Sequence, residues 1–256
     1  MSRYPSIIAA SLLAAMIGAT SQVSAAPSVA ATLSSAIADP ARPAADREQD
    51  TSRKPLEVLE FTGIKPGDRV ADFIPGGGYY TRIFSKIVGK TGHVYAVVPK
   101  ELSSMKKDAA AAVQKIAADR EYSNVTVIKE PAERFSAPEK LDMVWTSMNY
   151  HDLHDKFLGP ADMAVLNKNI FNALKPGGIY LVLDHAAAAG SGLRDTETLH
   201  RIDPAAVKTE VLAAGFVLEA ESNVLQNPKD DHTAKVFDPA IRGKTDKFIF
   251  KFRKPK

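Results

Sequence analysis

Histidine and aspartate stand side by side at four places in this 256-residue chain, and two of these pairs lie at or just after the ends of predicted strands. In the stretch NYHDLHD, His151 directly precedes Asp152. In the stretch YLVLDH, Asp184 directly precedes His185. Imidazole titrates near neutral pH, and a carboxylate partner fixes which ring nitrogen carries the proton, so these pairs suit general acid–base chemistry. We therefore predict that these four residues are catalytic.

Three more histidines in the second half of the chain extend the pattern, namely His154, His200 and His232. Imidazole and carboxylate groups can bind zinc or iron without cysteine, which keeps a metal site open as an alternative. A third alternative is that loop histidines simply hydrogen-bond the backbone. The spacing His151-x-x-His154 is a weak ligand pattern unless it lies on a helix, so we assign no metal site from the sequence.

A triple glycine lies in ADFIPGGGYYTR, residues 71–82. It separates a short apolar run from the start of a helix, where glycines let a backbone approach a ligand closely. A dinucleotide fingerprint would need glycine or alanine at Thr81, and a P-loop would need Gly-Lys-Ser/Thr, so neither motif fits. We predict a ligand-binding turn made by six residues: Asp72, Gly76, Gly77, Gly78, Tyr79 and Tyr80.

Strand and helix patterns alternate along the chain. We expect strands at 69–73, 93–98, 125–129, 141–146, 178–184, 216–222 and 247–253, and helices at 46–61, 79–88, 102–119, 161–174 and 204–214. This alternation predicts one doubly wound α/β domain with a mostly parallel sheet. Ligands bind such sheets beyond the carboxyl ends of the strands. The glycine turn, His151 and His185 therefore belong at one edge, and His200 is placed to return above them.

Composition excludes several classes of function. The chain has 45% hydrophobic and 25% charged residues, which is typical of a globular protein with a real core. Its formal charge of +3 is small and scattered, which argues against nucleic acid or an anionic membrane as partner. The absence of cysteine excludes disulfides, thiol catalysis and cysteine-ligated metal. A small-molecule ligand is the partner that remains, and the oligomeric state is not predicted.

The first 25 residues have the pattern of a secretory signal peptide. Arg3 gives a positive start, a short apolar stretch follows, and small residues precede a cleavage position after Ala25. An uncleaved anchor is the alternative. Residues 26–45 are rich in alanine, serine and proline without periodicity, which predicts a flexible linker. The domain would then cover residues 46–256 of an exported protein, either periplasmic or secreted.

Three stretches resemble motifs of the class I S-adenosylmethionine-dependent methyltransferases. They are RVADFIPGGGYYTRIF, KLDMVWTSMNYHDL and ALKPGGIYLVLDH, and the resemblance covers about Pro55 to Ala214. Within that family the chain looks most like exported predicted methyltransferases of unknown substrate. The resemblance implies a Rossmann-like fold with an antiparallel last strand and S-adenosyl-L-methionine bound at the glycine turn. It also implies methyl transfer to a small acceptor, and places the loop around His232 at the same edge as the other four histidines.

The chain departs from the family pattern at three positions. Ile74 stands where the first motif usually has glycine, Val98 where an acid would hold the ribose, and Pro131 near the acid expected at the adenine. Neighbouring acids that could substitute are Glu101, Glu130 and Glu133. These departures keep two alternatives open. One is an exported binding protein or cofactor-independent enzyme that uses a histidine-rich cleft, and a weaker one is a metal-dependent hydrolase.

Overall fold

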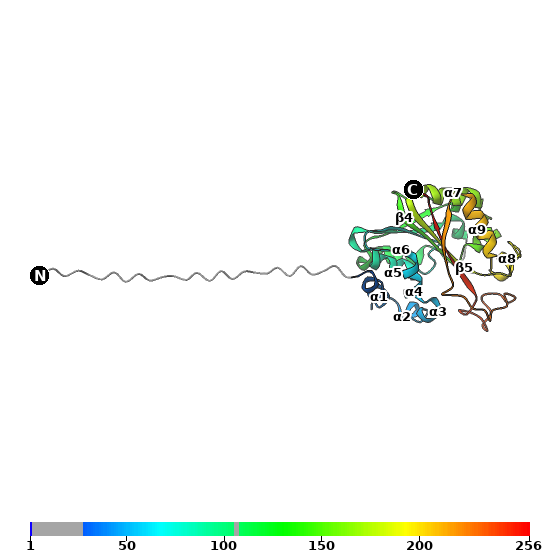
Figure 1. Ribbon diagram of the computed structural model, residues 1–256, viewed down its shortest axis with the longest axis horizontal. Helices are drawn as coiled ribbons and strands as arrows, with labels where there is room; N and C mark the ends of the chain where they lie inside the picture. The colour runs from blue at the N-terminus through cyan, green and yellow to red at the C-terminus, as the bar shows by residue number, and fades with distance from the viewer. Residues whose placement is uncertain (2–27, 105–107) are drawn as a thin grey trace.

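A seven-stranded sheet in the order β3-β2-β1-β4-β5-β7-β6 forms the centre of the computed structural model (Figure 1). The structure describes Met1 and residues 28–104 and 108–256, so the predicted signal peptide beyond Met1 lies outside the described residues. The strands are β1 (Arg69–Phe73), β2 (His93–Pro99), β3 (Val125–Glu130), β4 (Leu141–Ser147), β5 (Leu174–His185), β6 (Val217–Ser222) and β7 (Lys247–Arg253). All seven predicted strands are present.

The sheet is parallel from β3 to β5, and β7 runs antiparallel to both of its neighbours. The predicted fold class is therefore confirmed. Because the chain goes from β1 outward to β3 and then crosses back to β4, strand order reverses between β1 and β4. A topological switch point of this kind is where ligands bind in open α/β sheets.

Helices cover the sheet between successive strands (Figure 1). They are α4 (Pro55–Thr62), α5 (Tyr79–Val88), α6 (Ala111–Ala118), α7 (Met163–Ala173), α8 (Thr196–Leu199) and α9 (Pro204–Ala213). Two of them start at a capping carboxylate: Asp162 accepts from two backbone amides of α7, and Asp203 caps α9 with Pro204 at its first position. Helix α5 packs on β1 and β2, whereas α7 packs against α9 and β5.

The region expected to be a flexible linker contains structure, so the prediction for residues 28–45 is wrong. Helix α1 (Val29–Ile37) packs on α4 and α5, with Leu33 and Ala36 buried three residues apart on one face. Helices α2 (Ala44–Arg47) and α3 (Asp50–Arg53) follow along the same side of the molecule (Figure 1). The alanine-rich composition concealed this short apolar stripe.

The helix expected over 46–61 is broken into pieces. Lys54 has a φ of 43°, in the left-handed region, directly before Pro55. A residue before proline is pushed out of the helical conformation, which ends α3 and lets α4 begin with proline at its first position. The break allows α3 to turn over the start of α5 and places its side chains beside the glycine turn. Among the described helices, none is long and apolar enough to cross a membrane.

Candidate functional site

The glycine turn joins β1 to α5 at the switch point. Gly76 and Gly78 have φ values of 54° and 81°, which favour glycine, and Ile74 adopts a φ of 57°. A Cβ atom at Gly76 or Gly77 would meet nothing within 4 Å, whereas one at Gly78 would lie 2.2 Å from Ile116 Cδ1. The first two glycines therefore leave their backbone open, and Gly78 is needed for packing against α6.

Asp72 lies buried beneath this turn. Its carboxylate accepts a hydrogen bond of 2.6 Å from the Thr81 hydroxyl and interacts with the Thr81 backbone N–H, which holds the first turn of α5. Burial raises the pKa of Asp72 to about 7, although Thr81 and the nearby Arg53 guanidinium oppose the shift. The carboxylate is therefore poised to ionise when a positive group approaches.

The two tyrosines after the turn have different surroundings. Tyr80 is buried against Trp145, with ring centroids 4.6 Å apart, so it is part of the core. Tyr79 donates a 2.6 Å hydrogen bond from its hydroxyl to Asp50 on α3. The Arg53 guanidinium lies 4.5 Å from the centre of the Tyr79 ring. The N-terminal helices thus cover the start of α5.

A side-chain bridge joins the turn after β4 to the glycine turn. Asn149 donates from Nδ2 to the Ile74 carbonyl over 2.9 Å, and its Oδ1 accepts a 2.6 Å hydrogen bond from the buried Thr146 hydroxyl. The backbone of Met148 in this turn has a φ of 58°. Asn149 was not predicted as a site residue, and its position after a strand at the switch point was the signal that could have found it.

His151 and Asp184 form a buried pair immediately beyond this turn. Asp184 accepts from the His151 backbone N–H over 2.8 Å, and its two oxygens lie 2.9 and 3.0 Å from His151 Nδ1. On the other side of the ring, His151 Nε2 lies 3.1 Å from Asp152 Oδ1. Burial alone would lower the pKa of His151, but the Asp184 and Asp152 carboxylates raise it to about 10. The ring is therefore suited to holding a positive charge between two acids.

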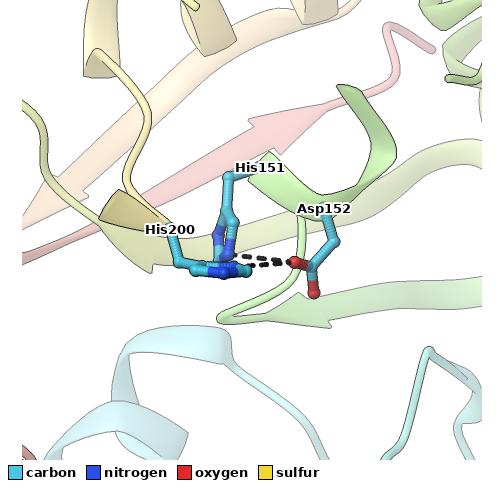
Figure 2. Close-up of side chains that lie close together, drawn as sticks. All are labelled: His151, Asp152 and His200. Atoms are coloured by element: carbon cyan, nitrogen blue, oxygen red, sulfur yellow. Dashed lines mark ion pairs between the residues drawn. The ribbon is translucent and has the colours of Figure 1, made fainter. Parts of the chain in front are cut away.

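His200 completes this group from the end of α8. Its Nδ1 lies 3.5 Å from the same Asp152 Oδ1, and its ring meets the His151 ring edge-on, with centroids 5.4 Å apart. Figure 2 shows the two imidazoles side by side and the Asp152 carboxylate facing both. His200 has a φ of 54°. The expectation that His200 returns above the strand ends is confirmed.

His185 lies beside the group but is held separately. Its ring centroid is 6.1 Å from that of His151, and its Nδ1 lies 2.8 Å from the Thr245 hydroxyl. Burial lowers the pKa of His185 well below its ordinary value, and the Lys247 ammonium lowers it further. His185 is therefore a neutral imidazole next to a charged one, although the two were predicted alike.

The remaining two histidines of the expected cleft lie with other partners. His154 Nε2 is 3.3 Å from Glu210 Oε2, and His232 Nε2 is 3.0 Å from Asp246 Oδ2. Each imidazole thus lies beside a carboxylate outside the group around His151. The structure brings together three of the five histidines that were expected at one edge.

The acids expected as substitutes for the missing ribose and adenine partners are engaged elsewhere. Val98 is buried at the end of β2. Glu101 accepts a hydrogen bond from the Ala132 backbone N–H, Glu130 accepts from Ser136, and Glu133 accepts from the Asp162 backbone N–H: these bonds tie loops together. The turn after β1 therefore keeps two glycines with open space, whereas the end of β2 has the buried Val98 in place of an acid.

Comparisons with known proteins connect this architecture to methyltransferases. No protein-family model matches the chain. Over 148 residues it is 30% identical to the ubiquinone/menaquinone biosynthesis C-methyltransferase UbiE of Vibrio cholerae, covering 56% of this chain and 52% of that protein. The chain thus spans about half the length of the curated relatives it matches.

Solved structures share the fold at low sequence identity. A SAM-dependent methyltransferase from Aquifex aeolicus is similar with a TM-score of 0.56 and 19% identity, covering 83% of this chain and 98% of that one. The [4+2]-cyclase SpnF is similar with a TM-score of 0.55 and 19% identity, covering 83% and 81% of the two chains. The fold of this chain is therefore that of the class I S-adenosylmethionine-dependent methyltransferases.

Proposed function

We propose that this chain, which has the class I methyltransferase fold and is related in sequence to such enzymes, transfers a methyl group from S-adenosyl-L-methionine to a small acceptor. The observation that carries the proposal is the turn at Gly76–Gly78. It lies at the switch point, and two of its glycines have open space where a side chain would stand. Such a turn admits a ligand's close approach to the backbone.

We assign some residues beyond the strand ends to the cofactor and others to the acceptor. Gly76 and Gly77 would admit the amino-acid end of the cofactor, and Asp72 would ionise to pair with its ammonium group. The cofactor supplies a methyl group activated on a sulfonium. Asn149 ties the acceptor side to the glycine turn. Rate enhancement would come mainly from holding acceptor and methyl in line, with His151 and its carboxylates facing the acceptor.

A second candidate is favoured by one observation. Val98 is buried where an acid would bind the ribose hydroxyls, so part of the usual cofactor contact is missing. The similarity to a [4+2]-cyclase indicates that this fold also carries chemistry other than methyl transfer. The alternative is an exported binding protein or a cofactor-independent enzyme that uses the cleft lined by histidines. It would not need the ribose-binding acid that Val98 replaces.

Valine in place of Gly77 tests the first candidate. The position has open space around it and a backbone conformation that does not require glycine, so folding should be unaffected. A branched side chain would nevertheless occupy the approach to the backbone. We expect calorimetric titration to show S-adenosylmethionine binding weakened by at least about tenfold, or roughly 1.4 kcal/mol. The affinity of Gly77→Ala for S-adenosylmethionine should lie between those of wild type and Gly77→Val.

One result would contradict methyl transfer, and a second would contradict the placement of the cofactor at the glycine turn. If wild-type protein releases no heat with millimolar S-adenosylmethionine or its demethylated product, the cofactor-independent alternative is favoured. If Gly77→Val binds as wild type while its melting temperature is unchanged, the glycine turn is not the cofactor site.

Export of the protein is a further part of the proposal, and it rests on the first 25 residues alone. We expect the mature protein to begin after Ala25, because small residues precede that bond. Mass spectrometry of protein recovered from the periplasm or medium of a bacterial host measures this directly. Recovery of the uncleaved chain in the cytoplasm would count against export.

A further inference from the structure

Three potential metal ligands converge on one point beyond the ends of β4 and β5. His151 and Asp152 come from the turn after β4, and His200 comes from the end of α8 (Figure 2). One ligand atom from each lies within 4.8 Å of the other two. Within this set, Asp152 Oδ1 is 3.1 Å from His151 Nε2 and 3.5 Å from His200 Nδ1. A zinc ion bound tetrahedrally at about 2.0–2.1 Å sets its ligands about 3.3 Å apart, so these spacings fit one ion.

The hydrogen bonding of His151 leaves its free nitrogen facing an acid. Both Asp184 oxygens lie within 3.0 Å of His151 Nδ1, so Nδ1 donates to this carboxylate, and the lone pair of a neutral ring then sits on Nε2. That lone pair points at the Asp152 carboxylate across 3.1 Å. Two acceptors at this separation repel unless a positive charge lies between them. The charge is either a proton on the ring or a cation shared with His200.

The surroundings of the group provide the outer contacts of a metal site. A histidine that ligates through one nitrogen usually donates from the other to a carboxylate, and Asp184 has that position toward His151. A third acid lies close by, since the buried Asp155 interacts electrostatically with both His151 and His200. The Asp155 carboxylate also interacts with the Thr196 side chain, although neither of its oxygens meets the geometric criteria of a hydrogen bond among the described residues. Three acids therefore surround two imidazoles, which leaves room for added positive charge.

We propose that His151, Asp152 and His200 form a binding site for one divalent transition-metal ion, and that Zn²⁺ fits it best. Two imidazoles and one carboxylate are a zinc set of the catalytic kind, in which three protein ligands leave a fourth position open. The side chains of Asp152 and His200 keep 22% and 18% of their surface exposed, so the open position is reachable from solvent. The absence of cysteine in the chain is no obstacle, because nitrogen and oxygen ligands suffice.

The site gives the acceptor side of the cleft a chemical function. A bound zinc ion lowers the pKa of a hydroxyl at its open position, which suits an acceptor that must lose a proton before methylation. This use rests on the proposed methyl transfer, whereas binding of the metal does not. His151 would then act as a ligand through Nε2.

The test measures metal binding alone, on full-length mature protein purified without a histidine tag. After treatment with a chelator and dialysis, titration with ZnCl₂ is expected to show one ion bound per chain. The melting temperature should rise with added Zn²⁺, since a ligand that binds only the folded state stabilises it. Absence of stoichiometric binding, with no change in melting temperature, would overturn the proposal.

Three variants show whether the ion is bound at these residues. His200→Asn keeps a residue that tolerates the left-handed backbone but removes the imidazole, and should weaken zinc binding at least about 100-fold. Asp184→Asn should weaken it about 10- to 100-fold by losing the outer contact. His232→Ala is the matched control, because that imidazole pairs with Asp246 away from the site, and should bind as wild type. Equal affinity in all variants would overturn the assignment.

A separate titration keeps the two proposals apart. His200→Asn should bind S-adenosylmethionine as tightly as wild type, since His200 lies outside the glycine turn. Zinc binding without cofactor binding would contradict methyl transfer and leave the metal site intact. Cofactor binding without zinc binding would contradict the metal site and leave the proposed methyl transfer intact.

Discussion

Asparagine in place of Asp72 is expected to make the protein more stable above pH 7, by up to about 4 kcal/mol, and to weaken cofactor binding at the same time. The physical reason is that the Asp72 carboxylate is buried and, within the described part of the chain, has no positively charged group in contact with it. Asp72 is fully enclosed, accepts from Thr81, and has its pKa raised to about 7. Holding this carboxylate ionised therefore costs folding free energy, about 1.4 kcal/mol for each unit of pKa displacement.

The sign of the pH dependence follows from the two states. The folded protein keeps a proton on Asp72 up to about pH 7, whereas the unfolded chain loses it near pH 4. Between these values the folded state binds more protons, so wild-type stability falls as pH rises through this window. The asparagine side chain cannot ionise, and the Asp72→Asn variant should lack this part of the decline. Urea unfolding of both proteins at pH 4.5 and pH 8 measures the difference.

The exposed Glu57 offers a control for that experiment. Glu57→Gln on the surface of α4 should change the free energy of unfolding by less than about 0.5 kcal/mol at either pH. If Asp72→Asn is destabilising at pH 8, the carboxylate contributes more to folding through Thr81 than its burial costs. A gain in stability with a loss of binding would mean that the acid is kept for its ligand at the expense of the fold.

The sequence was sufficient to predict the sheet because its signals are local. Most strands are short apolar runs that begin or end near glycine, proline or aspartate, and β7 was predicted at its observed bounds, Lys247–Arg253. The N-terminal segment was harder, since Leu33 and Ala36 are an apolar face of only two buried residues within an alanine-rich stretch. This apolar face is buried because α1 packs on α4 and α5, and such tertiary contacts cannot be predicted from the local sequence.

The sequence predicted where the site lies but not which of its side chains contact each other. The positions after β1, β4 and β5 follow from the topology, and His151 and Asp184 do meet there. Which histidine joins which acid depends on side-chain directions that spacing does not give. The Asp184 carboxylate contacts the ring of His151 and only the backbone N–H of its neighbour His185, whose ring nitrogen is instead 2.8 Å from the Thr245 hydroxyl. Adjacent residues on a strand point to opposite faces, which separates pairs that look alike in sequence.

A buried ion pair next to His200 anchors the long loop before β7. Arg201 has no exposed side-chain surface and makes two hydrogen bonds to Asp230, of 2.9 and 3.0 Å. The same guanidinium donates to the carbonyls of Ala186 and Ala234. Asp230 accepts in addition from two backbone amides of the loop. The pair therefore holds the end of β5, the residue after His200 and the loop together.

Alanine in place of Asp230 is expected to lower the free energy of unfolding by about 3–5 kcal/mol, because it leaves Arg201 as a buried charge without its partner. Asp231→Ala is the matched control next in sequence: its carboxylate is exposed and bonds only to Thr233, so its effect should stay below about 1 kcal/mol. Urea unfolding measures both. A small effect at Asp230 would mean that Arg201 reaches water when its partner is lost. In that case the loop opens easily, and His200 owes its position to α8 rather than to the ion pair beside it.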